Sequence, residues 1–77
     1  MLQLSDKWGP FLISQPETGM GYQVATILLQ NGSRYDQVLI EAGYITRIRG
    51  RQDIPFREDQ IAKIIITHDK WNFASER

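Results

Sequence analysis

Short runs of β-branched and aromatic residues, separated by turn residues, dominate the hydrophobic pattern of this chain. The clearest pattern covers residues 22–40, where two such runs flank Asn31-Gly32. Asn and Gly both tolerate the positive φ angles of a tight hairpin turn. The pattern therefore predicts a β-hairpin with strands over 22–29 and 34–40.

The register of this hairpin depends on the turn. A two-residue turn pairs Leu28 with Tyr35 and Val24 with Leu39, whereas a bulged turn shifts each pairing by one residue. On either register both faces of the hairpin carry apolar side chains. We therefore expect the second face to be covered by a closed barrel, by the N-terminal segment or by a partner subunit.

Three further strands are expected, over 11–14, 44–49 and 64–68, with a loop over 15–21. In the strand over 44–49, simple alternation directs Ile45 and Ile48 to opposite faces. Pro55 and the acids that follow it favour one 3₁₀ or α turn before the last strand.

These elements predict one mostly β domain of 77 residues. We expect a small five-stranded barrel or a strongly bent antiparallel sheet with one short helical turn. Residues 1–10 would form an N-terminal arm, 11–68 the barrel and 69–77 a C-terminal tail that packs back through its aromatic residues.

This order of elements resembles two families of small five-stranded barrels, the Src-homology-like and the Sm-like proteins. Ile48-Arg49-Gly50 resembles the Arg-Gly strand end with which Sm-like proteins contact RNA, and Leu29-Gln30-Asn31-Gly32 resembles their hairpin. Glu41-Ala42-Gly43 replaces their Asp-x-x-x-Asn loop, and Met20-Gly21-Tyr22 does not match the tyrosine-rich loop of proline-peptide-binding barrels. We therefore take only the expected architecture from this resemblance and assign neither function from it.

Composition removes several kinds of chemistry from consideration. The chain has no cysteine, so it has no disulfide, thiolate nucleophile or cysteine-ligated zinc. No apolar run approaches the ~18 residues of a membrane span, and the N-terminus does not resemble a secretory signal. We expect a cytoplasmic protein that needs no cofactor and no membrane.

Three arginines form the strongest candidate binding feature. Arg47, Arg49 and Arg51 occur at alternate positions and would form one basic stripe if the strand continued that far. Tyr35 and Tyr44 could then stack on bases beside it. An acidic protein partner or a plain solvated strand face explains the same pattern, and the net charge of zero gives no long-range attraction for nucleic acid.

No group of residues predicts catalysis. His68 is the only histidine, and it could act as a base beside Asp69 or simply bond to its neighbours at a strand end. Glu58 and Asp59 could form a carboxylate pair for acid–base work, but they also lie where a helical turn favours negative charge. We therefore expect no enzyme activity and no metal site.

Large apolar residues near both termini and in the last strand predict an interface. They are Trp8, Phe11, Ile65, Trp71 and Phe73. The aromatic residues could be lids on the core or an exposed patch. The run Ile64-Ile65-Ile66 places apolar groups on both faces of a strand, which would aggregate at a sheet edge unless paired. We therefore expect a binding domain that self-associates or binds a protein, with nucleic-acid binding as the alternative.

Overall fold

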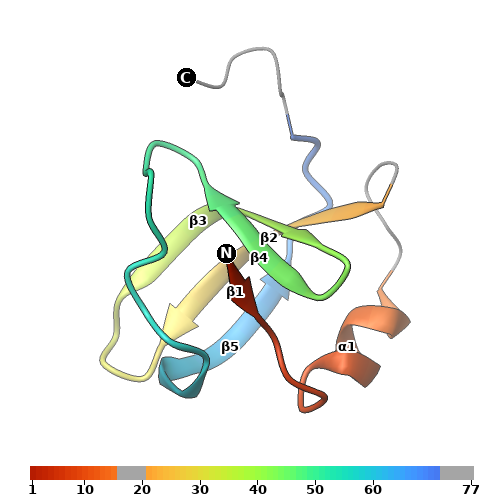
Figure 1. Cartoon of the computed structure of the whole chain (residues 1–77), viewed down its shortest axis with the longest axis horizontal. Helices are drawn as coiled ribbons and strands as arrows, with labels where there is room; N and C mark the ends of the chain where they lie inside the picture. The colour runs from red at the N-terminus through yellow and green to blue at the C-terminus, as the bar shows by residue number, and fades with distance from the viewer. Residues whose placement is uncertain (16–20, 72–77) are drawn as a thin grey trace.

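The computed structural model describes residues 1–15 and 21–71 of the chain. Figure 1 shows a single curled sheet with one short helix beside it. The strands are β1 (Leu2–Gln3), β2 (Tyr22–Leu29), β3 (Arg34–Glu41), β4 (Tyr44–Ile48) and β5 (Ile61–Ile66). The helical elements are α1 (Gly9–Ser14) and a 3₁₀ turn, η1 (Glu58–Gln60). Most of the expected loop over 15–21 lies outside the described residues.

All pairings in the sheet are antiparallel, in the order β1-β4-β3-β2-β5. The sheet bends into a half-barrel, with β1 and β5 as its two edge strands (Figure 1). The expected fold class, a mostly β five-stranded curled sheet with a short helical turn before the last strand, is confirmed.

The N-terminal segment differs from its prediction. Residues 11–14 form part of α1 and not a strand, because Pro10 occupies the first turn of the helix, where its fixed φ is favourable and its missing N–H costs nothing. The first strand is β1, within the expected arm, where Leu2 pairs with Ile45 and Gln3 with Tyr44.

The β2–β3 hairpin uses both of the registers that its sequence allows. Near the turn Leu28 lies opposite Arg34, as a bulged turn requires, whereas farther along Val24 lies opposite Leu39, as a two-residue turn requires. The change of register lies at Gln37, which has a φ of 56°. A bulge in β3 therefore separates the two registers and bends the hairpin.

A second bulge reverses the alternation in β4. The register shifts between Leu39 and Ile40, which leaves Thr46 as the extra residue. Ile45 and Ile48 are consequently both buried in the core, at 0% and 2% exposure. The prediction that they face opposite sides of the sheet is wrong, because one inserted residue exchanges the two faces.

The inner face of the curled sheet carries the main hydrophobic core. Its buried side chains come from four strands, from the N-terminal arm and from the loop before η1. They are Leu4, Ala25, Ile27, Leu29, Val38, Ile40, Ile45, Ile48, Phe56, Ile61 and Ile64. Trp8, Phe11 and Leu12 pack against this cluster, so the arm and α1 cover part of the inner face.

The outer face of the sheet carries a second, smaller cluster. Val24 and Leu39 are buried there against Trp71, and Tyr22 packs beside them. Trp71 is only 4% exposed. The segment that follows β5 thus covers this part of the outer face. The expected covers were a closed barrel, the N-terminal segment or a partner subunit.

Candidate functional site

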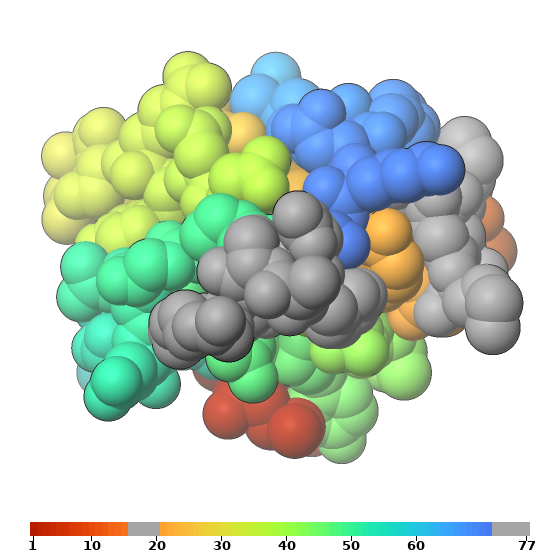
Figure 2. Space-filling view, turned by 90° about the horizontal axis from the view of Figure 1, so that it is seen from above, coloured from red at the N-terminus to blue at the C-terminus, as the bar shows by residue number. Residues whose placement is uncertain are grey.

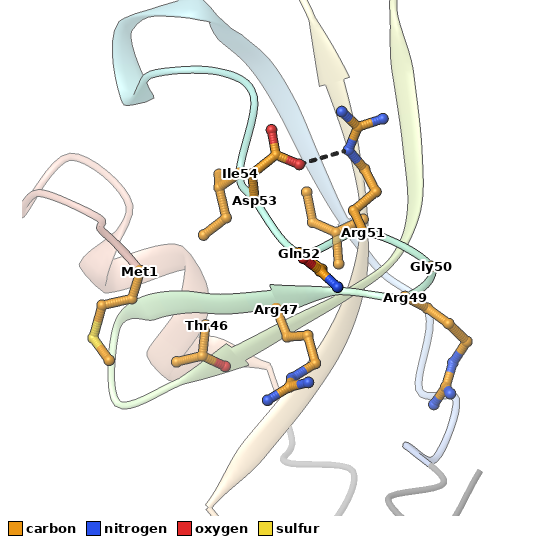
Figure 3. A pocket seen from close by; sticks show the side chains of 10 residues that line it. Met1, Thr46, Arg47, Arg49, Gly50, Arg51, Gln52, Asp53 and Ile54 are labelled. Carbon is orange, nitrogen blue, oxygen red and sulfur yellow. Dashed lines mark ion pairs between the residues drawn. The ribbon is translucent and has the colours of Figure 1, made fainter. Parts of the chain in front are cut away.

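The three arginines do not lie on one continuous strand. β4 ends at Ile48, and the chain then turns through Gly50, which has a φ of 82°. Figure 3 shows the side chains of Arg47 and Arg49 on one side of this segment and that of Arg51 on the other. The expected single stripe is therefore not formed.

An open hollow of about 670 Å³ adjoins the arginines. Residues 46–54 line it together with Met1 (Figure 3). Arg47, Arg49 and Arg51 all contribute to its walls, together with one acid, Asp53. The lining carries three cations and one anion, so it has the charge to hold a small anionic group.

Tyr35 and Tyr44, which were expected to stack on bases beside the arginines, lie in different parts of the structure. Tyr35 packs against the core, with its ring centroid 5.2 Å from that of Phe56. Arg51 lies over the Tyr35 ring at 5.8 Å, and its Nε is 3.4 Å from Asp53 Oδ1. Tyr44 lies opposite Glu41 on β3 and opposite Gln3 on β1, and it does not line the hollow.

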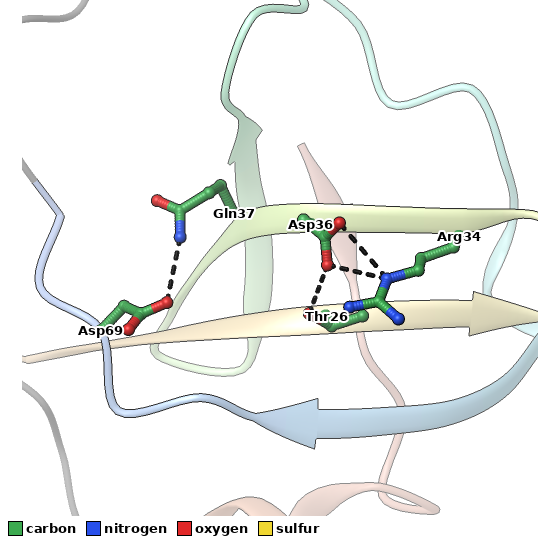
Figure 4. Close-up of polar contacts among 5 residues, drawn as sticks. All are labelled: Thr26, Arg34, Asp36, Gln37 and Asp69. Carbon is green, nitrogen blue, oxygen red and sulfur yellow. Dashed lines mark hydrogen bonds and ion pairs between the residues drawn. The ribbon is translucent and has the colours of Figure 1, made fainter.

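The segment after β5 is fastened across the outer face by several contacts. Arg49 Cζ lies 4.1 Å from the centroid of the Trp71 ring, and the backbone N–H of Trp71 donates to Tyr22 Oη at 3.2 Å. Gln37 Nε2 donates to Asp69 Oδ2 at 3.1 Å (Figure 4). Figure 2 shows the surface of this segment, in blue, beside the yellow-green surface of β3. Arg49 is thus engaged in holding the cover over the outer cluster.

The four predicted interface residues that lie in the described part of the chain are dispersed. Trp8 and Phe11 are partly buried against the inner core, and Trp71 is the buried cover of the outer face. These three aromatic residues serve as lids and do not form one exposed patch. Ile65 is 39% exposed, and Phe73 lies outside the described residues.

β5 presents the longer of the two sheet edges. Among residues 1–15 and 21–71, only β2 pairs with it. Ile61 and Ile64 face the inner core, whereas Lys63 and Ile65 lie on the outer face opposite Leu28 and Thr26. An exposed isoleucine therefore lies within a six-residue edge strand.

A polar cluster lies on the outer face beside Ile65. The hydroxyl of Thr26 donates to Asp36 Oδ1 at 2.7 Å, and Arg34 Nε donates to the same oxygen at 3.0 Å (Figure 4). Two hydrogen bonds lower the pKa of Asp36 below its ordinary value of 3.8, and the bond from Thr26 has a larger effect than the bond from Arg34. The bond to Asp36 satisfies the hydrogen-bonding requirement of the buried Thr26 hydroxyl. The cluster therefore has a structural role, and no ligand is needed to account for it.

The candidate acid–base residues have structural partners or exposed positions. Glu58 accepts a hydrogen bond from the backbone N–H of Ser5, which lowers the pKa of Glu58 below its ordinary value of 4.5. Asp59 is paired with Arg57 at 3.3 Å. His68 is exposed just after β5, and no cluster of three or more metal-ligating residues occurs in the described part of the chain.

The sequence predicted a tail over 69–77 that packs back through its aromatic residues, but it did not show that the segment over 67–71 is fastened across the outer face. Its one local signal was Trp71, and the contacts that hold it come from β2, β3 and the end of β4. Sequence reasoning also missed β1, because two residues are too short to show a strand pattern.

Comparisons with known proteins leave the chain without an assigned family. No protein-family model matches it, and neither does any curated protein or solved structure. None of the helices in the described ranges could cross a membrane, since α1 has only six residues.

Proposed function

We propose that this protein is a non-catalytic interaction domain that associates with a second copy of itself through the edge of β5. One observation carries the proposal. β5 is a six-residue edge strand with Ile65, at 39% exposure, on its outer face. Edge strands of this kind pair readily with other strands unless specific devices prevent it.

The two edges of the sheet differ in how they discourage pairing. At one edge β1 has only two residues, and such a short strand offers little backbone to a partner. β5 is three times as long, and it contains no proline. Its protective devices are Lys63 and a bulge where Ile61 pairs with Leu29. Both devices lie in its first half, so the second half, which contains Ile65, supports pairing.

The expected association is weak and depends on concentration. Pairing of two short strand segments buries much less than the ~800 Å² per partner of a standard interface. A dissociation constant in the micromolar range or above follows, which corresponds to about 8 kcal/mol or less. The zero net charge leaves no long-range repulsion between copies.

The test uses two exposed isoleucines as a matched pair. Ile65→Lys places a charge on the β5 edge, whereas Ile13→Lys places one on α1, where Ile13 is 87% exposed. Light scattering at increasing protein concentration should show association for the wild type and for Ile13→Lys, and a monomer for Ile65→Lys. Equal masses for the two variants would contradict the proposal, provided that circular dichroism shows both to be folded.

A second function, binding of a nucleic-acid backbone or another polyanion, is favoured by the hollow beside the arginines. Phosphate binding by two or three guanidinium groups would fall steeply with salt. Arg47→Gln is the suitable test, because Arg49 contacts Trp71 and its loss would also disturb the outer cover. Salt-sensitive binding of single-stranded RNA that Arg47→Gln weakens and Arg57→Gln preserves would favour this function over the first.

A further inference from the structure

We infer that two copies pair their β5 strands antiparallel about a two-fold axis at Ile65, with Ile65 of each copy opposite Ile65 of the other. The inference rests on the proposed self-association and specifies its register. It follows from the direction of the backbone groups of β5 and from the positions of its side chains.

The alternation of hydrogen bonds along β5 shows which of its backbone groups point away from β2. The N–H of Thr67 donates to the carbonyl of Val24 at 3.0 Å, in register with the pairing of Ile65 opposite Thr26. In an antiparallel ladder, bonded and non-bonded pairs alternate. Ile65 and Thr67 therefore bond toward β2, and Ile64 and Ile66 direct their N–H and C=O groups away from it.

These outward groups flank Ile65 symmetrically. With a two-fold axis at Ile65, Ile64 of each copy exchanges two backbone bonds with Ile66 of the other. The two copies together form four such bonds. Ile65 then lies opposite its counterpart in a non-bonded pair, where side chains approach most closely.

Three alternative registers bring the two strands into conflict. A shift by one residue in a single strand would place the inner face of one sheet on the outer face of the other. An axis at Lys63 would place two lysines opposite each other, and like charges in that position are destabilising. An axis at Ile64 would leave the exposed Ile65 opposite Lys63 and would require pairing through the bulge at the start of β5.

The register at Ile65 avoids each of these conflicts. It places the exposed apolar side chain against an identical one, and it places Lys63 opposite Thr67, a short polar side chain. The bulged start of β5 remains outside the paired segment. The occupant that this edge fits best is therefore a second copy of the same strand.

Disulfide trapping tests the register directly, because the chain contains no cysteine. In a non-bonded antiparallel pair the Cα atoms are about 4.5 Å apart, within the range that a disulfide spans. Ile65→Cys should therefore form a covalent dimer under mild oxidation at least tenfold faster than Ile13→Cys, an exposed control on α1. Lys63→Cys alone should not form one, whereas a mixture of Lys63→Cys and Thr67→Cys should form a heterodimer.

The outcomes separate the register from the proposed function. A concentration-dependent mass for the wild type with no preferential trapping at position 65 would overturn the register and leave self-association standing. Trapping between Lys63→Cys and Ile65→Cys would likewise overturn it and indicate an axis at Ile64. A wild-type mass that stays monomeric would overturn both.

Discussion

The guanidinium of Arg49 lies over the ring of Trp71, with 4.1 Å between Arg49 Cζ and the ring centroid. This contact joins the loop after β4 to the segment after β5 across the outer face. A cation over an aromatic face is worth about 0.5–2 kcal/mol, more where water is excluded. The buried position of Trp71 favours the upper part of that range.

A double-mutant cycle should measure this contact. Arg49→Met keeps much of the side-chain length and removes the charge, and Trp71→Leu removes the ring. We expect a coupling free energy of about 0.5–2 kcal/mol when the unfolding free energies of the wild type, the two single variants and the double variant are compared by urea unfolding. Strictly additive effects would show that the two side chains do not stabilise each other.

Trp71→Ala should destabilise the protein more than any change at Arg49. Its loss uncovers Val24 and Leu39, and removal of a buried aromatic side chain costs about 3–5 kcal/mol. That is a large part of the roughly 4–11 kcal/mol expected for a domain of this size. Trp71→Phe should lower the free energy of unfolding by less than half as much as Trp71→Ala. A Trp71→Ala variant with wild-type unfolding free energy would contradict the role of this segment as a cover.

Ala42 offers a simple stabilising substitution. Ala42 and Gly43 form the turn between β3 and β4 with φ angles of 52° and 81°, and a turn of this type favours Asn-Gly. A non-glycine residue at positive φ costs about 1–2 kcal/mol, with Asn tolerated better than Ala. Ala42→Asn should therefore raise the midpoint of thermal unfolding by about 2–8 °C.

Ala42→Val is the control for this prediction, because a β-branched side chain is still less compatible with positive φ. It should lower the midpoint. A higher midpoint for Ala42→Val than for Ala42→Asn would show that the turn does not have this conformation in solution.

Stability should decrease in acid partly through Asp36. The hydrogen bond from Thr26 and the pairing with Arg34 lower the pKa of Asp36 below 3.8 in the folded protein. A carboxyl group with a lowered folded pKa stabilises the fold above its unfolded value of about 3.9, and this contribution disappears as pH falls through the folded pKa. Glu58 should act in the same direction, through its bond from Ser5.

Urea unfolding measured as the pH is lowered from about 6 through the unfolded pKa of Asp36 checks this prediction. Asp36→Asn should flatten the pH dependence of the unfolding free energy, and Asp6→Asn, a change at an exposed residue, is the control. Thr26→Val should move the Asp36 pKa upward in an NMR titration. An Asp36 pKa that stays the same in Thr26→Val would show that the Thr26 hydroxyl is not the main cause of the lowered pKa.

The parts of the fold that local sequence specifies were predictable. Asn31-Gly32 and the residues around it specify a hairpin, and Glu58 and Asp59 favour the short helical turn η1 before the last strand. Pro55 was expected to open this turn, but it lies before the N-cap residue Arg57. The bulges at Gln37 and Thr46 were not predictable, because each depends on pairing with a strand elsewhere in the chain. One bulge was enough to exchange the faces assigned to Ile45 and Ile48.

The candidate site was predictable only in part. Arg47, Arg49 and Arg51 do gather around one hollow, but a turn at Gly50 separates their directions, and Arg49 is engaged with Trp71. The sequence could not show that engagement, because the two residues are far apart along the chain. It did indicate that the isoleucine run in the last strand would need a partner if that strand lay at an edge.

The weight-average mass of the wild-type protein as a function of concentration tests the central claim most directly. Light scattering should give a value near 8.9 kDa in dilute solution that rises toward twice that mass as the concentration passes through the micromolar range. Absorbance at 260 and 280 nm, recorded on the same sample, should show no bound nucleic acid. A mass that stays at the monomer value up to millimolar concentration would contradict self-association through β5.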